Sequence, residues 1–390
     1  MAQELAQRQM GHLTSAPCGL VEKSQSETLP GAPKSLSLNG LWYRQYELSA
    51  ASRHLLEAIK IGDRWLVEKH LSEKAVPDCC DAAGLTPLHA ATNSDRPDLV
   101  HLLLENSADA QAPAGPLFDG PPISVASRQG HVDCLKLLLA AHALPETASG
   151  SNAGTCVQHA AAEGHAECIQ LLLQAHYNTV KVAARGGVEE SILDHSDLVA
   201  NFPDARRRLP IHYASHHGHT ESVVVLIRRG FSLLDKVDVA GDAALHLGVF
   251  APIEETAAEI CRCILDGSGD VNLLNALRQT PLHLAASQSR PAVSMVLLHY
   301  GGDVGLVDAV KRRTPLHCAA RAGCAEICLQ LVLAKADPHI RDDGDGTPLM
   351  CARTHACLDV LATAKSRAES HSYSWNMDLA LLDGGGGLAA

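Results

Sequence analysis

Histidine is concentrated in one short stretch of the chain, and its side chain is well suited to bind metals or move protons near neutral pH. The segment HYASHHGHTES, residues 212–222, holds four of the 22 histidines, His212, His216, His217 and His219. Taken alone, this spacing is compatible with the first half of a zinc site or with a proton relay. Whether these histidines bind a metal, move protons or only support the fold depends on the elements that position their four side chains.

The chain also contains 13 cysteines, but their spacing does not complete a metal site. The adjacent Cys79 and Cys80, and the pair Cys261 and Cys263, lack the two-by-two spacing of a structural zinc site. The segment RDDGDGT, which starts at Arg341, is as acidic as a calcium loop but lacks the closing glutamate. We therefore predict no metal and no cofactor.

Signatures of catalysis are also absent from the sequence. It contains no GxGxxG turn after a strand, no Walker loop, and neither a GxSxG nor an HExxH motif. We predict no catalytic residues and no enzyme. An enzyme site within the irregular segment at about residues 175–208 remains as an alternative.

Composition narrows the class of protein. The formal charge of −12 argues against direct binding of nucleic acid, because such proteins normally carry a basic face. Aromatic residues make up 3% of the chain and hydrophobic residues 46%, which favours closely packed short helices. No secretory leader and no membrane-spanning apolar run is evident. We expect an intracellular protein, cytoplasmic or nuclear or both, with reduced thiols.

The elements that position these residues follow from an internal repeat. Clear copies of one motif read GLTPLHAA from Gly84, TPLHLAA from Thr280 and TPLHCAARAG from Thr314, and TPLM begins at Thr347. With the weaker copies, nine repeats begin at residues 53, 86, 121, 155, 209, 243, 280, 314 and 347. All steps but one are 33 to 37 residues, and an apolar segment such as VDCLKLLL follows the motif. Such a period is typical of a solenoid protein.

The repeat resembles the ankyrin repeat family over about residues 50–365. The resemblance implies an all-α solenoid of stacked helix–turn–helix units with β-hairpin loops, whose first and last units are caps. The motif suits this fold, because threonine caps a helix, proline fits its first turn, and alanines let two helices approach closely. One helix pair cannot bury its apolar face alone, so neighbouring pairs must stack.

The repeat places most histidines and cysteines in the framework of this fold. The tetrad position, where the resemblance implies a hydrogen bond to neighbouring backbone, is occupied by His89, His212, His246, His283 and His317. The Gly-His turn contains His131, His165 and His219. Inward positions of the second helices are occupied by Cys134, Cys168, Cys261 and Cys328. We therefore predict structural roles for these histidines and cysteines.

The resemblance also implies that partners bind the hairpin tips and the exposed side of the first helices, on a concave face. Two variable residues per repeat lie there, between the paired alanine position and the turn glycine. They are Thr92 and Asn93, Arg128 and Gln129, Ala162 and Glu163, His216 and His217, Ser287 and Gln288, and Arg321 and Ala322. We predict that residues of this set contact a partner.

Basic residues recur in the loops that precede the motif. They are Arg206, Arg207 and Arg208, then Arg278, and then Lys311, Arg312 and Arg313. Two interpretations stay open, namely docking onto acidic side chains or phosphates, and ordinary exposed charge. Asp238 and Asp242 interrupt the row and favour ordinary charge. The candidate partner-binding residues nevertheless include Arg206, Arg208, Lys311 and Arg313.

The chain is expected to have three parts. Residues 1–38 are predicted to be a disordered tail, residues 39–365 the repeat array, and residues 366–390 a C-terminal cap or flexible tail. About 20 extra residues interrupt the array at about 175–208, as a truncated repeat or as an insertion carrying one helix. The segment WNMDLALL is either a cap on the last repeat or a helical ligand for another protein.

These features predict a non-catalytic module that binds one or more proteins and acts as a scaffold, an adaptor or an inhibitor. We expect a monomer that presents a pre-ordered surface, so that little conformational entropy is lost on binding. A regulatory or targeting subunit of an enzyme, and a nuclear co-regulator, remain as alternatives.

Overall fold

A computed structural model describes residues 50–81, 84–113, 120–144, 154–185, 202–228 and 234–369, with backbone only for 176–185 and 365–369. The chain divides into two compact units, Met1–Gly150 and Ser151–Ala390. We call them the N-terminal and the C-terminal unit. The predicted N-terminal tail and the segment WNMDLALL lie outside the described residues, so both remain predictions.

The described residues form nine helix pairs, one for each predicted repeat. The N-terminal unit contains α2 (Ala50–Ile61) with α3 (Arg64–Ser72), α4 (Pro87–Asn93) with α5 (Pro97–Glu105), and α6 (Pro122–Gln129) with α7 (Val132–Ala140). The C-terminal unit contains α8 (Cys156–Glu163) with α9 (Ala166–Arg185), α11 (Pro210–His217) with α12 (Thr220–Arg228), α13 (Ala244–Gly248) with α14 (Glu254–Asp266), α15 (Pro281–Ser287) with α16 (Pro291–His299), α17 (Pro315–Ala322) with α18 (Ala325–Leu333), and α19 (Pro348–Cys351) with α20 (His355–Glu369). The predicted all-α solenoid is confirmed.

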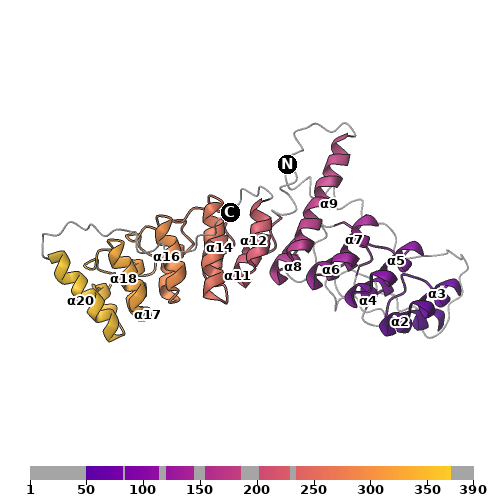
Figure 1. Cartoon of the computed structure of the whole chain (residues 1–390), viewed down its shortest axis with the longest axis horizontal. Coiled ribbons are helices and arrows are strands. Elements are labelled where there is room, and N and C mark those ends of the chain that lie inside the picture. Colours follow the sequence, from indigo (N-terminus) through magenta and orange to yellow (C-terminus); the bar gives the residue numbers. More distant parts are fainter. Residues whose placement is uncertain are drawn as a thin grey trace, which may run out of the picture. The chain divides into compact units, whose positions relative to one another are not determined.

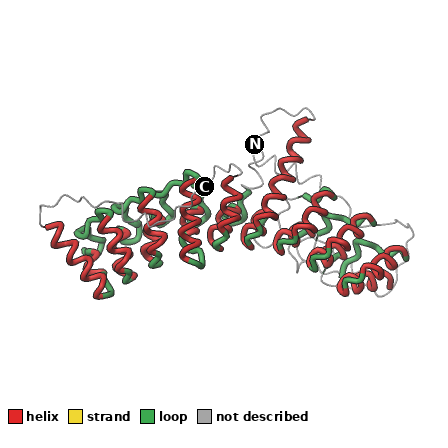
Figure 2. The backbone as a smooth tube through the Cα atoms, in the orientation of Figure 1, coloured by secondary structure: helices red, strands yellow, loops and turns green. Residues whose placement is uncertain are grey.

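Within each unit, first helices pack on first helices and second helices on second helices. Figure 1 shows α12, α14, α16, α18 and α20 side by side in chain order in the C-terminal unit. The loops that lead from one pair to the next run along one edge of this row, as Figure 2 shows in green. Each repeat therefore presents its first helix, its second helix and its loop at the same place as its neighbour does.

The helices begin and end where the motif predicts. The Thr280 hydroxyl accepts a hydrogen bond from the backbone N–H of His283, and Pro281 occupies the first turn, where no N–H is needed. Four first helices end at a glycine in the left-handed region, which only glycine adopts at low cost. These are Gly130, Gly164, Gly218 and Gly323. The local sequence thus fixes both ends of the short first helices.

The core lies between the helices of successive pairs. Leu103, Leu138, Ile169 and Ile260 have no exposed surface, and neither has Ile327. The four cysteines predicted to face inward, at positions 134, 168, 261 and 328, are completely buried as well. Their prediction as small apolar core residues is confirmed.

The loops differ from the predicted β-hairpins. Among the described residues, β pairing is limited to one isolated antiparallel bridge between Val237 and Ala243. Five turns of the C-terminal unit, which we call the hairpin turns, are closed by a backbone hydrogen bond between first and last residues. They comprise residues 204–208, 238–242, 275–279, 308–313 and 342–346. The turns are too short to extend a ladder, so no strand forms in the part of the chain that the structure describes.

The extra residues at about 175–208 do not separate the repeats that flank them. Helix α8 packs directly on α11, and α9 on α12. The side-chain amide of Gln158 donates hydrogen bonds of 2.9 Å to the carbonyl of Phe202 and 2.7 Å to that of Arg208. The segment starts as a continuation of α9 to Arg185, and residues 186–201 are not described. The fourth and fifth repeats are therefore immediate neighbours, with no further repeat stacked between them.

Candidate recognition surface

The tetrad histidines hold consecutive repeats together. In His283, Nδ1 accepts a hydrogen bond from the backbone N–H of Thr280, and Nε2–H donates to the carbonyl of Arg313 in the next hairpin turn, at 3.2 and 3.0 Å. His212, His246 and His317 make the same two kinds of bond. In the N-terminal unit, His89 Nε2–H donates to Gly120. The predicted structural role is confirmed for this position.

Burial determines the protonation state of these rings. It lowers the pKa of His89, His212, His246, His283 and His317 below the ordinary value of 6.5. Nδ1 accepts a hydrogen bond from a backbone N–H, and a proton on Nδ1 would break this bond and bring two N–H groups together. The tetrad histidines are thus neutral structural links at neutral pH.

Histidines of the Gly-His turn make a second kind of link. His219 Nε2–H donates to the carbonyl of Ala162 at 3.0 Å, and His131 Nδ1–H donates to that of Thr92 at 2.8 Å. The described residues contain no group of three or more histidine, cysteine or acidic side chains that could hold a metal ion. With His212 and His219 bonded to the backbone of neighbouring repeats, the stretch HYASHHGHTES leaves His216 and His217 outside these links.

Each hairpin turn is folded by the acid or amide at its first residue. Asp238 Oδ1 accepts from the backbone N–H groups of Ala240 and Asp242, at 2.8 and 3.1 Å. Asn275 Oδ1 accepts from Leu277 and Gln279 in the same way. The acidic segment from Arg341 is the last of these turns, in which Asp342 plays this part. It is therefore a turn of the scaffold.

Two of the predicted partner-binding arginines belong to the scaffold. Arg208 Nε lies 3.0 Å from Asp238 Oδ2 in the next hairpin turn, and both side chains are largely buried. Arg313 pairs with Asp342 at 3.4 Å in the same geometry. The structure gives Arg208 and Arg313 a role within the scaffold, because each pairs with an acid of the neighbouring turn, and their contact with a partner stays a prediction. Arg206 and Lys311 are exposed and stay candidates.

In the N-terminal unit, one predicted contact residue is misplaced. Thr92 is completely buried, and its hydroxyl donates to the carbonyl of Leu88 at 2.7 Å. Counted from the cap residue Thr86, Thr92 occupies the position of buried alanines in other repeats, and the exposed pair is Asn93 and Ser94. The prediction is one residue too early because the alanine pair of this repeat, Ala90 and Ala91, lies one residue nearer the cap than in other repeats. In the next repeat, Gln129 is exposed and Arg128 is half-buried.

In the C-terminal unit, we call the equivalent positions the first-helix face. The exposed members that the sequence predicted are Glu163, His217, Gln288, Arg321 and Ala322. Ala162, His216 and Ser287 are half-buried, and the Ser287 hydroxyl donates to Leu284. The structure therefore presents these positions in successive repeats, and their role in binding stays a prediction.

His216 and His217 lie in different environments. His217 Nδ1–H donates to the carbonyl of Tyr213 at 2.9 Å, and its ring is exposed. Burial, with the neighbouring His217 and Arg208, lowers the pKa of His216, whose Nδ1 is buried without a hydrogen-bond partner. The Tyr213 hydroxyl donates to Asp204 at 2.6 Å. His217 is therefore the histidine of this pair that is accessible to a partner.

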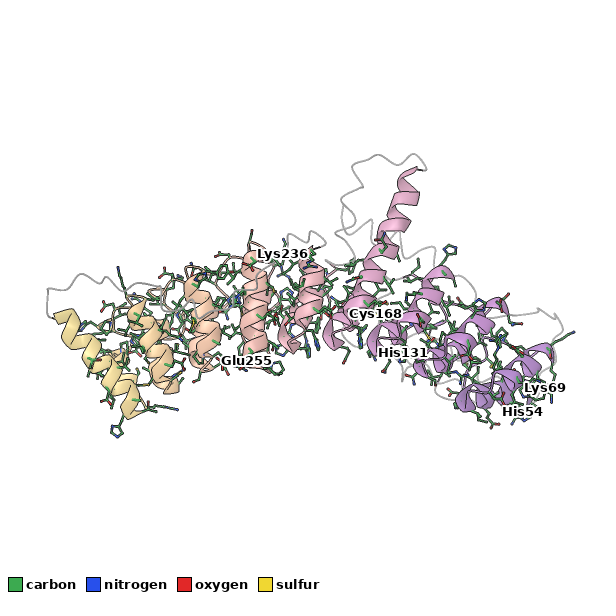
Figure 3. All side chains as sticks on the ribbon, viewed as in Figure 1. His54, Lys69, His131, Cys168, Lys236 and Glu255 are labelled. Carbon is green, nitrogen blue, oxygen red and sulfur yellow. The ribbon has the colours of Figure 1, made fainter. Side chains whose placement is uncertain are left out.

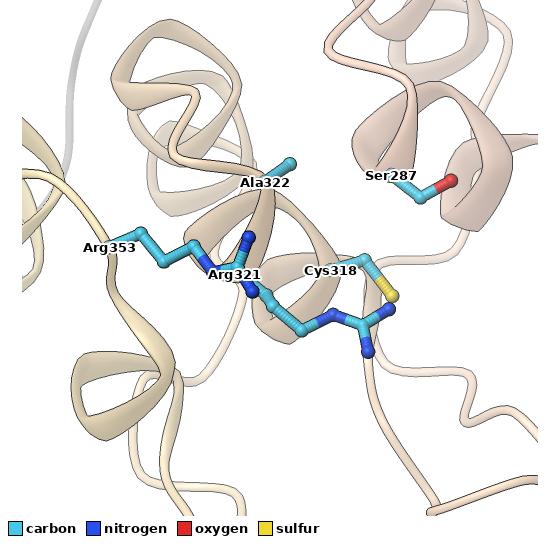
Figure 4. Close-up of a pocket in the computed structure, with 5 residues that line it drawn as sticks. All are labelled: Ser287, Cys318, Arg321, Ala322 and Arg353. Atoms are coloured by element: carbon cyan, nitrogen blue, oxygen red, sulfur yellow. The ribbon is translucent and has the colours of Figure 1, made fainter.

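A pocket of about 270 Å³ lies on the first-helix face between the seventh and ninth repeats. It is lined by Ser287, Cys318, Arg321, Ala322 and Arg353 (Figure 4). Neither arginine has an ion pair or a side-chain hydrogen bond within the described part of the chain, and no carboxylate lines the pocket. Burial raises the pKa of Cys318 to about 11, so its thiol is protonated. The pocket thus offers two guanidinium groups to an anion.

The sequence singled out Ser287, Arg321 and Ala322 in this pocket but missed Cys318 and Arg353. Arg353 was overlooked because the last repeat has no turn glycine to mark the variable positions. Counting from the cap residue gives no signal for it, because the sixth residue after the cap is buried in other repeats. Arg353 is exposed because α19 already ends at Cys351.

No helix among the described residues is long and apolar enough to cross a membrane. Family models described as ankyrin repeats match residues 55–147, 249–342 and 292–370. Related models of the same repeat match residues 123–173 and 207–239. Together these matches cover well over half of the chain.

Several proteins are similar to parts of the chain. A putative palmitoyltransferase ZDHHC13 of Danio rerio is 30% identical over 168 residues, covering 41% of this chain and 25% of that protein. NF-kappa-B inhibitor alpha of Homo sapiens is 34% identical over 100 residues, covering 26% and 31%. The B-cell lymphoma 3 protein homolog of Mus musculus is 26% identical over 203 residues, covering 43% and 44%.

The chain thus spans less than half the length of each of these relatives. What it shares with them is the repeat rather than a complete protein. Nine helix pairs, histidine links between repeats and the family matches agree with one another. The chain belongs to the ankyrin repeat family.

Proposed function

We propose that this protein is a non-catalytic interaction module that holds another protein on its first-helix face and acts as a scaffold, an adaptor or an inhibitor. The observation that carries this proposal is the pocket between Arg321 and Arg353, which holds two cations without a carboxylate. Around it, exposed and varied side chains such as Gln288 and His217 occupy equivalent positions of a rigid scaffold. A fixed surface of this kind binds with little loss of conformational entropy.

The pocket suits a carboxylate of the partner. Guanidinium groups bind carboxylates through paired N–H donors, and such charge-assisted bonds are stronger than neutral ones. Ser287 and Cys318 surround the pocket with small side chains that leave room for an aspartate or glutamate. We infer that an acidic side chain anchors the partner between the seventh and ninth repeats.

The relatives support a role in regulation by binding. NF-kappa-B inhibitor alpha is by its name an inhibitor of another protein. An inhibitor that binds a partner monomerically, in the cytoplasm or nucleus, is therefore one form of the proposed function. The relative named a putative palmitoyltransferase favours a second candidate, a regulatory or targeting subunit of an enzyme.

Affinity purification from a cell extract tests the proposal with two matched variants. His217→Ala/Gln288→Ala/Arg321→Ala removes three exposed side chains of the first-helix face. The control, Glu259→Ala/Arg262→Ala/Glu326→Ala, removes three exposed side chains of the second helices. We expect both to melt like the original protein, because surface substitutions typically change stability by less than about 0.5 kcal/mol.

Only the first-helix variant should lose its partners, by about tenfold or more in recovered amount, since loss of one residue that dominates an interface costs about 2 kcal/mol or more. Equal recovery with both variants would place the interface elsewhere. Recovery of one stoichiometric enzyme supports the regulatory subunit, whereas several unrelated proteins support the scaffold.

A further inference from the structure

The hairpin turns of the C-terminal unit form one continuous edge, which we call the hairpin edge. Figure 3 labels Lys236 at this edge and Glu255 at the opposite edge of the same unit. Each turn is joined to the next by a backbone hydrogen bond. These bonds run from Val239 N–H to Arg206 O, from Ala276 N–H to Ala240 O, from Ala309 N–H to Leu277 O, and from Asp343 N–H to Lys311 O, at 2.8 to 3.3 Å. The tips of the turns are thus held in a fixed row.

Charge is segregated along this edge. The acids at the start of the turns, Asp204, Asp238 and Asp308, are buried and accept backbone N–H groups of their own turn. The cations at the tips are exposed, and within the described part of the chain none is paired with a carboxylate. They are Arg206, Arg207, Arg278, Lys311 and Arg312. Three of the first four turns therefore present cations outward, and the turn 238–242 carries none.

An apolar side chain stands at the tip of three consecutive turns. Val239, Leu277 and Val310 are 67%, 51% and 57% exposed. Isolated exposed apolar residues are common, but one per repeat in three successive repeats forms a row. The hairpin edge therefore combines an apolar row with flanking cations.

The backbone of the turns is not available for strand addition. The N–H groups of Val239, Ala276 and Ala309 already donate to the neighbouring turn. Those of Ala240, Leu277 and Lys311 donate to the acid or amide of their own turn. A ligand of this edge must therefore be recognised through side chains rather than through a β-ladder.

We propose that the hairpin edge binds an acidic, amphipathic helix of a partner protein. Successive repeats stack at helix-packing distance, roughly 8–10 Å. Seven residues of an α-helix rise about 10 Å, so apolar residues spaced by seven would meet Val239, Leu277 and Val310 in turn. Glutamates and aspartates beside that stripe would meet Arg207, Arg278 and Arg312, whereas Asp343 and Asp345 end the basic stretch.

The composition of the edge favours a protein ligand over nucleic acid. The five turns contain no aromatic side chain on which a base could stack. A phosphate backbone has no apolar surface that could cover Val239, Leu277 and Val310. In addition, the formal charge of −12 on the whole chain repels a polyanion such as nucleic acid. The proposal requires a protein ligand, as the proposed function does, but places it on a different surface.

The arginines at the tips allow a test that preserves the fold. Arg207, Arg278 and Arg312 have φ of 60°, 55° and 51°, in the left-handed region. Gly241 occupies the equivalent position of another turn with φ of 78°. Arg207→Gly/Arg278→Gly/Arg312→Gly therefore removes three charges at sites where glycine is the least strained residue. The matched control is Lys74→Gly/Lys335→Gly, because both lysines are exposed with φ of 66° and 65° and lie in other turns.

The probe is a fluorescein-labelled helical peptide of about three heptads, with leucine at every seventh position and glutamate beside it. Its binding to the full chain is measured by fluorescence anisotropy, next to a peptide of the same composition whose leucines are off this period. We expect the triple glycine variant to bind the first peptide about tenfold more weakly, and the lysine control to bind it unchanged. Val239→Ser/Leu277→Ser/Val310→Ser should abolish the preference for the first peptide.

Equal binding of both peptides, or unchanged binding by the triple glycine variant, would overturn the proposal. So would a DNA duplex that binds more tightly than the peptide and competes with it. Purified partners separate this proposal from the first-helix face. If only His217→Ala/Gln288→Ala/Arg321→Ala loses them and the peptide does not bind, the proposed function stands and the hairpin-edge proposal fails.

Discussion

At the scale of the residue, the neutral tetrad histidine is the main recurring polar link of the scaffold. Its two ring nitrogens are used differently, one accepting from a helix cap and one donating to the next repeat. Gln158 replaces histidine in the fourth repeat and reproduces both contacts, since its side-chain carbonyl accepts from Thr155 N–H at 2.6 Å. Glutamine, which does not titrate, is thus a natural substitute for this histidine.

Replacing His246 and His283 by glutamine should weaken the pH dependence of stability. Their folded pKa values lie below 6.5, so the unfolded chain takes up protons first as pH falls. The original protein therefore loses stability below about pH 6.5, until the folded rings also protonate. Urea denaturation at about pH 7.5 and about pH 5.5 measures this, and the variant should lose less between the two values.

At about pH 7.5 the variant should match the original within about 1 kcal/mol, since both bonds are kept. A loss on acidification as large as that of the original protein would contradict the role of these two rings.

At the scale of the element, the hairpin turn depends on its first residue more than on its exposed charges. Asp238 both folds its own turn and pairs with Arg208 of the preceding turn. Asn275 folds the equivalent turn without a charge, and its amide donates to Asp242 at 2.9 Å. The two roles of the acid can therefore be separated by substitution.

Asp238→Ala should cost about 2–3 kcal/mol of unfolding free energy, because it removes the turn acceptor and leaves Arg208 without its partner. Asp238→Asn should cost about 1 kcal/mol, because the amide oxygen keeps the turn while the charge is lost. Urea denaturation of both variants checks this difference. Equal losses would mean that the ion pair alone stabilises the turn.

The sequence predicted the repeats well and the surface less well, for physical reasons. The period and the cap residues located nine helix pairs, because these features are local. The direction of side chains in a turn is not local: Arg207 and Arg208 are adjacent, yet one points outward and the other pairs with Asp238. Thr92 was misplaced because the alanine pair of its repeat lies one residue nearer the cap, and Arg353 was missed because α19 has only four residues and no turn glycine follows it.

At the scale of the whole molecule, each described unit is held together by neighbouring repeats, as in other repeat proteins. The C-terminal unit passes from the fourth to the fifth repeat through α8 and α11, although about 20 extra residues lie between them in the sequence. Gln158 spans this junction through bonds to Phe202 and Arg208. The fourth and fifth repeats therefore stack directly on each other even though extra residues separate them in the sequence.

Replacing residues 186–201 by a glycine–serine linker should leave the melting temperature within a few degrees, because loop length affects stability only weakly. Thermal melting followed by circular dichroism measures this. In contrast, Gln158→Ala should lower the unfolding free energy by about 1–3 kcal/mol, since it removes the bonds across the junction. Loss of cooperative melting in the linker variant would show that the replaced segment belongs to the core.

The presence of glutamine rather than histidine at position 158 also affects how the C-terminal unit responds to acid. Four junctions between its repeats are closed by tetrad histidines, whereas at the junction beside the long interruption this position holds the Gln158 amide, which does not titrate, and His219 adds a second link. Protonation of the tetrad position therefore acts on the array from the fifth repeat onward. The tetrad position beside the interruption of the chain is the one in this unit that carries no titrating group.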